Sequence, residues 1–159
     1  MKRKLQLSLL LLALTTACGN TELNSEQQSS ETTTAEIITL TQTGCQFLET
    51  ESKDYQYQTA SSEDCKQINS KTLSERKKSF KPLQLKPGKY TFRVTNRNVP
   101  YELGFYLRGE GVSQVTLPKV SGGGLNKGKT QDYQITLKPG KYVFSCPLNP
   151  TPDYPVIVQ

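Results

Sequence analysis

Apolar and polar positions are distributed very differently in three parts of the chain. Residues 7–14 form one short apolar run, residues 19–35 are almost entirely polar, and from Glu36 onward short runs of β-forming residues are separated by turn residues. Short strands punctuated by turns are the sequence habit of a β-sandwich or barrel. The pattern therefore predicts one all-β domain over residues 36–159.

Seven runs in this domain have the character of strands. In the run that starts at Tyr90, the side chains of Tyr90, Phe92 and Val94 share one face, and the run from Tyr142 to Cys146 repeats the pattern. Both faces are expected to point into the core. The seven predicted strands are 36–42, 90–96, 101–109, 113–120, 131–137, 142–146 and 154–159, and the glycine-rich segment 120–130 is expected to be a turn.

The segment 61–78 has a different pattern and predicts one short helix inserted into the β domain. Ser61 or Ser62 can cap the start of a helix, and the acidic residues that follow suit its positive end. Cys65 and Ile68 begin a stripe that is spaced to be partly buried.

The N-terminus predicts export. Basic residues at positions 2–4, the apolar run and small residues before Cys18 have the layout of a signal peptide, residues 1–17. The end of this signal resembles a bacterial lipobox, which implies lipidation at Cys18, with ordinary cleavage as the alternative. Residues 18–35 lack the apolar side chains needed to fold and predict a disordered tether. The expected location is the bacterial cell envelope, periplasmic or extracytoplasmic, with the membrane as a partner through the lipid anchor.

Charge and composition indicate which classes of binding partner to expect. The formal charge falls from +6 to +3 when the signal is removed, because the signal contributes three cations and no acid. The remaining chain has no basic face with interleaved aromatic residues, so a nucleic acid is not an expected partner.

The cysteines predict a disulfide in the helical insertion. Once Cys18 is assigned to lipid, an odd number remains, and an exported chain must then leave one cysteine unpaired or pair it between molecules. Cys45 and Cys65 bracket the insertion, so they are the expected pair and Cys146 is left free. A loop of this size would contribute roughly 3 kcal/mol to stability. Pairings of Cys146 with either other cysteine stay open.

Two segments resemble the cupredoxin family of secreted copper proteins. They are residues 90–105, which contain "VTNRNVPYELGF", and residues 137–154, "LKPGKYVFSCPLNPTPDY", which are followed by a last strand "PVIVQ". The resemblance implies a Greek-key β-sandwich of cupredoxin type. In that family, two histidines, one cysteine and a weak axial methionine hold copper for electron transfer.

Carried over by position, the family's ligands fall on Tyr101, Cys146, Asn149 and Tyr154, so only the thiol is retained. The sequence contains no histidine, and its single methionine is Met1. An amide oxygen and a neutral phenol are poor ligands for copper. We therefore expect no cofactor and a degenerate copper site, with copper held at a non-standard site at Cys146 as the alternative.

The same residues suggest what the domain does instead. The two tyrosines can fill the former site, and Asn149 can bond its own loop backbone. No histidine base or cofactor motif accompanies Cys146, so we expect a non-catalytic binding or structural module. An envelope protein is a candidate partner. The surface of this chain that we expect to contact the partner consists of Tyr101, Phe105, Tyr106, Arg108 and Tyr154.

Overall fold

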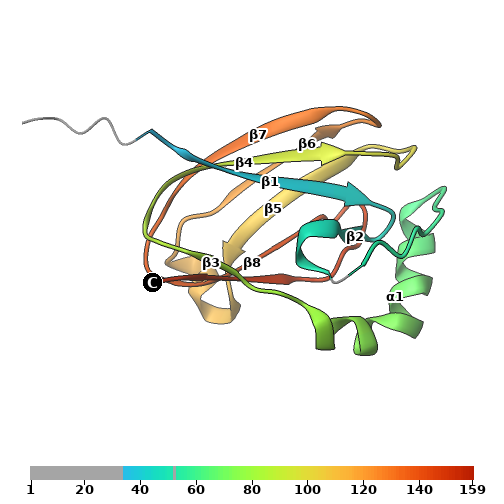
Figure 1. Cartoon of the computed structure of the whole chain (residues 1–159), viewed down its shortest axis with the longest axis horizontal. Coiled ribbons are helices and arrows are strands. Elements are labelled where there is room, and N and C mark those ends of the chain that lie inside the picture. Colours follow the sequence, from blue (N-terminus) through green and yellow to red (C-terminus); the bar gives the residue numbers. More distant parts are fainter. Residues whose placement is uncertain (1–33, 52) are drawn as a thin grey trace, which may run out of the picture. The chain divides into compact units, whose positions relative to one another are not determined.

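Two β-sheets pack face to face and enclose the core (Figure 1). The computed structural model describes residues 34–51 and 53–159, so the predicted signal peptide, Cys18 and the predicted tether up to residue 33 lie outside the described residues. One sheet has the strand order β2, β1, β4, β7 and the other the order β3, β9, β8, β5, β6. The strands are β1 (Glu36–Thr43), β2 (Gln46–Phe47), β3 (Leu83–Leu85), β4 (Gly88–Asn96), β5 (Leu103–Gly109), β6 (Val120–Leu125), β7 (Thr130–Leu137), β8 (Gly140–Ser145) and β9 (Tyr154–Val158).

The chain crosses repeatedly between the two sheets. It passes from β4 in one sheet to β5 in the other, returns from β6 to β7, and crosses again to β8. Strand β1 runs parallel to β4 and β3 runs parallel to β9, whereas the other pairs are antiparallel. The predicted all-β, Greek-key sandwich with one helical insertion is confirmed.

The core contains the two faces that the alternation predicts. Tyr90, Phe92 and Val94 on β4 are buried, as are Tyr142 and Phe144 on β8. Aromatic rings link the two sheets, because Phe105 on β5 lies 5.6 Å from Phe92 on β4 between ring centroids. Within its own sheet, Phe105 lies 5.9 Å from Phe144 on β8. Such aromatic pairs add about 0.5–1.5 kcal/mol each beyond the area that they bury.

The predicted helix is present as α1 (Ser62–Arg76), which continues into the 3-10 turn η2 (Lys77–Ser79). Its start is capped by Asp64, whose carboxylate accepts hydrogen bonds from the backbone N–H groups of Ala60 and Ser61 at 2.7 and 2.9 Å. These backbone bonds lower the pKa of Asp64. Only Cys65 and Arg76 of α1 are fully buried, so these two side chains fasten the helix to the sandwich.

The predicted strand 113–120 is wrong. This segment overlaps a 3-10 helix, η3 (Gly111–Val115), and the next strand is β6, inside the glycine-rich segment that was expected to be a turn. The glycines are needed because neighbouring groups come very close. A Cβ on Gly122 would lie 2.9 Å from the ring of Tyr133, and a Cβ on Gly104 would lie 2.6 Å from the carbonyl oxygen of Gly122.

Among residues 34–51 and 53–159, no helix has both the length and the apolar character required to cross a membrane.

Candidate functional site

The candidate site lies at the end of the sandwich where α1 is attached. Tyr101 belongs to the connection between β4 and β5, Cys146 directly follows β8, and Asn149 lies in the loop after it. The Tyr101 hydroxyl donates a hydrogen bond to Asn149 Oδ1 at 3.0 Å. The structure therefore brings together two of the positions that the resemblance assigns to copper ligands.

Asn149 is fully buried and connects three parts of the chain. Its Nδ2 donates to the carbonyl oxygen of Thr43 at 2.9 Å, and its Oδ1 accepts from the backbone N–H of Cys45 at 3.3 Å. The expectation that this amide would bond its own loop backbone is wrong, because its two backbone partners, Thr43 and Cys45, lie more than one hundred residues away in the sequence. Asn149 therefore holds the C-terminal loop against the turn between β1 and β2.

The disulfide between Cys45 and Cys65 is present, as predicted. Its position was not foreseen: Cys65 Sγ lies 3.2 Å from Asn149 Oδ1 and 3.9 Å from the Tyr101 hydroxyl. A disulfide sulfur carries no proton, so the contact with the amide oxygen is one of packing. The sulfur bridge covers the Tyr101–Asn149 pair. We call Tyr101, Asn149 and this disulfide the plug.

Asn96, the last residue of β4, shapes the loop that carries Tyr101. Its Nδ2 donates to the carbonyl oxygens of Val99 and Leu125, both at 3.1 Å, and its Oδ1 accepts from the backbone N–H of Val99 at 2.9 Å. Buried polar groups satisfied in this way fix a loop conformation. Sequence reasoning did not single out Asn96, although it ends the "VTN" run on which the resemblance rests.

Cys146 is the one free cysteine in the described chain, and it is fully buried. Burial raises the pKa of its thiol, although backbone N–H groups, first that of Gly104 at 3.3 Å from Sγ, act in the opposite direction. Burial also raises the pKa of Tyr101. Both groups are therefore neutral at neutral pH.

Tyr154 is not hydrogen-bonded to the plug, and its hydroxyl has partners elsewhere. Its hydroxyl accepts a hydrogen bond from the backbone N–H of Phe47 at 3.3 Å and donates one to Glu51 Oε1 at 2.5 Å. Glu51 is also paired with Arg76, at 2.6 and 2.9 Å, and both side chains are almost completely buried. We call Tyr154, Glu51 and Arg76 the buried ionic cluster.

Burial and the Glu51 carboxylate shift the pKa values of Tyr154 and Arg76. The pKa of Tyr154 lies well above its ordinary value, first because of burial and then because of the adjacent Glu51 carboxylate. Burial opposes the charge of Arg76, but the hydrogen bond and charge of Glu51 outweigh it and raise the pKa of the guanidinium. The Arg76 guanidinium therefore stays charged inside the protein.

The predicted partner surface is only partly accessible. Phe105 is 1% exposed and Tyr154 is completely buried, so neither can contact a partner. The prediction is wrong for these two residues because both rings face the core. Tyr106 and Arg108 are half-buried, and the Arg108 guanidinium lies 4.7 Å above the Tyr106 ring.

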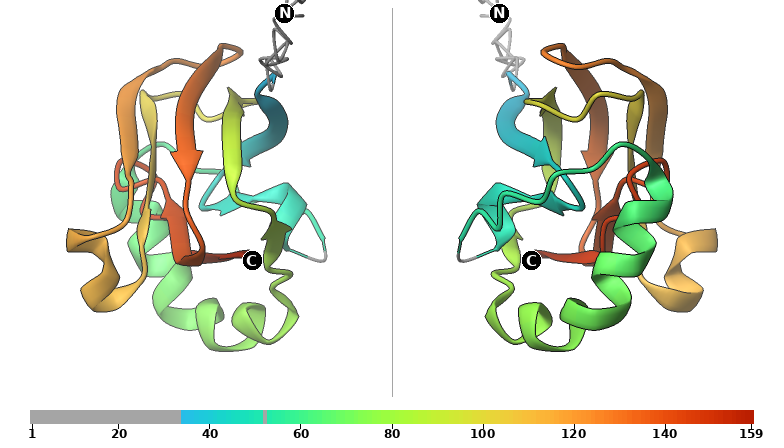
Figure 2. Two further views of the ribbon diagram at one scale, coloured as in Figure 1. Left: turned by 90° about the vertical axis from the view of Figure 1, so that its left-hand side faces the viewer. Right: turned by 90° about the vertical axis from the view of Figure 1, so that its right-hand side faces the viewer.

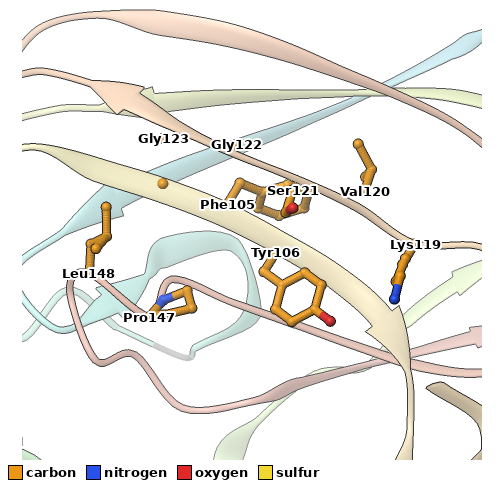
Figure 3. A pocket seen from close by; sticks show the side chains of 10 residues that line it. Phe105, Tyr106, Lys119, Val120, Ser121, Gly122, Gly123, Pro147 and Leu148 are labelled. Atoms are coloured by element: carbon orange, nitrogen blue, oxygen red, sulfur yellow. The ribbon is translucent and has the colours of Figure 1, made fainter. Parts of the chain in front are cut away.

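A groove of about 690 Å³ runs along β5 and β6 beside the loop that follows Cys146 (Figure 3). Tyr106 and Leu148 lie along it, and Leu148 is 45% exposed. The groove is lined by Gly104, Phe105, Tyr106, Lys119, Val120, Ser121, Gly122, Gly123, Pro147 and Leu148. Of the predicted contact residues, Tyr106 is the one that the groove presents to solvent.

The side chains at the candidate site do not fit a copper ion. Asn149 Oδ1 is already an acceptor for Tyr101 and Cys45, Tyr101 is a neutral phenol, and no imidazole exists in the sequence. Copper sites of the cupredoxin kind use two imidazoles and a thiolate. In the part of the chain that the structure describes, no three His, Cys, Asp or Glu side chains are grouped to hold a metal.

Comparisons with known proteins give a weak likeness. No family model matches the chain, and no curated protein matches it. Among solved structures, a reduced Cu(I) form, at pH 4, of a proline-to-glycine mutant of amicyanin aligns with 17% sequence identity over 50% of this chain and 72% of that chain, with a TM-score of 0.35. A likeness at that score says nothing about the site of this chain.

Proposed function

We propose that this chain is a non-catalytic lipoprotein of the cell envelope, whose cupredoxin-like domain has lost its copper site and serves as a binding or structural module. The observation that carries the proposal is the plug: the side chains at two former ligand positions are bonded to each other, to the backbone and against the disulfide. A metal ion is not needed to hold this end of the domain together.

The plug supplies the cross-links that a metal would otherwise supply. Asn149 ties the C-terminal loop to the β1–β2 turn, and the disulfide ties α1 to the same turn. The loop also contains Pro147, Pro150 and Pro152, whose fixed φ angles reduce the entropy lost on folding. These features favour a rigid domain end without a cofactor.

A non-catalytic role is supported by the state of Cys146. A cysteine nucleophile requires an accessible thiolate and usually a neighbouring base. Cys146 is buried, burial raises its pKa, and the sequence has no histidine to deprotonate it. Its thiol is suited to packing.

Addition of Cu(II) to the purified oxidised protein tests the loss of the copper site. We expect no intense blue absorption, because the Cys146 thiol is protonated and no imidazoles lie beside it. An intense blue band that is absent from the Cys146→Ser variant would contradict the proposal. It would assign the chain to the copper-binding alternative at Cys146.

A cross-linker placed in the groove separates a binding module from a structural one. A photoreactive side chain at Tyr106, expressed in cells, should yield a defined envelope adduct if the groove binds a protein partner. The same group at exposed Lys127, outside the groove, is the control. No adduct, or the same adduct from both positions, would favour the structural role.

A further inference from the structure

The end of the sandwich opposite the plug carries two copies of the sequence Lys-Pro-Gly-Lys, at residues 86–89 and 138–141. The two turns are neighbours because Gly88 on β4 pairs with Leu137 on β7. The first described residues lie at the same end, since Glu36 pairs with Tyr90 near the start of β4. We call this the turn end; it faces the viewer in the left panel of Figure 2.

The short helix η3 projects from the turn end (Figure 2). It is fastened there because the backbone N–H of Glu110 donates to the carbonyl oxygen of Lys141 at 2.9 Å, and because Leu117 packs against Gly140, where a Cβ would lie only 2.8 Å from it. Val112 and Val115 are 89% and 84% exposed. Residues three apart in a 3-10 helix lie on one side, so η3 presents both valines to solvent together.

Exposed apolar side chains are concentrated at this end. In the described chain four large hydrophobic residues are exposed, and three of them, Ile37, Val112 and Val115, lie at the turn end, whereas Leu148 lies at the other. Exposed apolar side chains gathered in one region mark interaction sites more often than scattered ones.

Unpaired positive charge also lies at the turn end. Five exposed lysines lie at the turn end: Lys86, Lys89, Lys119, Lys138 and Lys141. Within residues 34–51 and 53–159, none of the five forms an ion pair. The acidic side chains at this end are Glu36 and Glu110, and Asp153, which borders the same pocket as Gly111 and Gln114 of η3, is paired with Arg108. The unpaired lysines therefore outnumber the acids.

We propose that the turn end docks on an anionic phospholipid membrane, with the two valines of η3 entering the interface and the lysines facing lipid phosphates. Apolar tips among lysines are the combination that binds anionic bilayers. The described chain begins at this end, so a lipid anchor at Cys18 would be joined to the domain here. The inference takes its biological setting from the proposed lipoprotein, but its test does not require the anchor.

Vesicle sedimentation tests the charge contribution. All described elements lie within the unit Thr32–Gln159, so a chain that starts at residue 19 keeps the fold without lipid. This protein should sediment with vesicles of phosphatidylglycerol and phosphatidylcholine and not with phosphatidylcholine alone. Replacing both Lys138 and Lys141 by glutamine should weaken binding roughly 25-fold, at about fivefold per lysine.

The matched control changes two exposed lysines at the opposite end, Lys127→Gln with Lys129→Gln, which removes the same charge. This variant should bind nearly as the unchanged protein does. Equal weakening by the two pairs would show that net charge alone drives binding, and it would overturn the proposal. If the protein bound a soluble polyanion but not the vesicles, the turn end would be assigned to an acidic protein partner. That result would also overturn the membrane proposal.

Tryptophan fluorescence tests the apolar contribution, because the sequence contains no tryptophan. A Val115→Trp variant should show a blue-shifted emission when anionic vesicles are added, whereas Leu148→Trp at the other end should not. No shift at position 115, or equal shifts at both, would overturn the membrane orientation. The copper test examines the proposed loss of the copper site, and the vesicle tests examine membrane docking. Failure of one proposal can therefore be told apart from failure of the other.

Discussion

Replacing Asn149 by alanine removes the side chain that holds the plug together. The variant leaves the carbonyl oxygen of Thr43 and the backbone N–H of Cys45 without their partners, and both residues are buried. A buried polar group left unpaired costs about 1–3 kcal/mol, so the two together should lower the free energy of unfolding by roughly 2–6 kcal/mol. Tyr101, which is half-buried, also loses its acceptor but can turn to solvent. The loss is a large share of the total stability of a small domain, about 5–15 kcal/mol.

Urea unfolding followed by circular dichroism measures this loss. With an m-value of about 2 kcal/mol/M, the midpoint should fall by roughly 1–3 M while the slope stays constant. The control is Asn126→Ala, in an exposed loop, which should change the free energy of unfolding by less than about 0.5 kcal/mol. If the two variants were equally stable, Asn149 would not be holding this end of the domain, and the argument for a plug would fail.

The other predictions concern the disulfide, the buried ionic cluster and alkaline pH. Reduction of the disulfide, which spans 20 residues, should cost about 3 kcal/mol in the same urea assay, and no change on reduction would refute this. Arg76→Met should cost about 3–5 kcal/mol because it leaves Glu51 buried without its partner, whereas Lys78→Met, which breaks an exposed pair, should cost under about 1 kcal/mol. Burial raises the pKa of Tyr154 well above 10 and that of Tyr133 to about 12. A raised pKa keeps the proton on the folded state longer, so stability should be constant below about pH 10 and fall as the pH rises toward 12. Unfolding free energies measured from pH 8 to 11.5 check this, and a flat profile would contradict it.

Much of the fold follows from local patterns in the sequence. Alternating apolar residues correctly located β4 and β8, because each strand has one face in a continuous core. The helix start was predictable because capping is local: Ser61 and Asp64 are only three residues apart. The glycine-rich strand β6 was missed because its place in the sheet depends on close approach to Tyr133, a contact that no local pattern reveals.

The sequence predicted some of the residues of the candidate site, but it did not predict how they contact each other. The absence of histidine and the pairing of Cys45 with Cys65 could be read from the sequence. That the disulfide lies on Asn149 depends on how the helical insertion folds back against the C-terminal loop. Glu51 and Arg76 are 25 residues apart, and no sequence pattern marks either of them as buried. Only the folded chain therefore identifies their ion pair.

The metal content of the protein isolated from its own cells, without chelators, tests the central claim most directly. The proposed loss of the copper site predicts less than about one-tenth of a copper ion per chain, because the resemblance puts an amide and a neutral phenol at the positions where imidazoles would be required. Stoichiometric copper that disappears in the Cys146→Ser variant would contradict it.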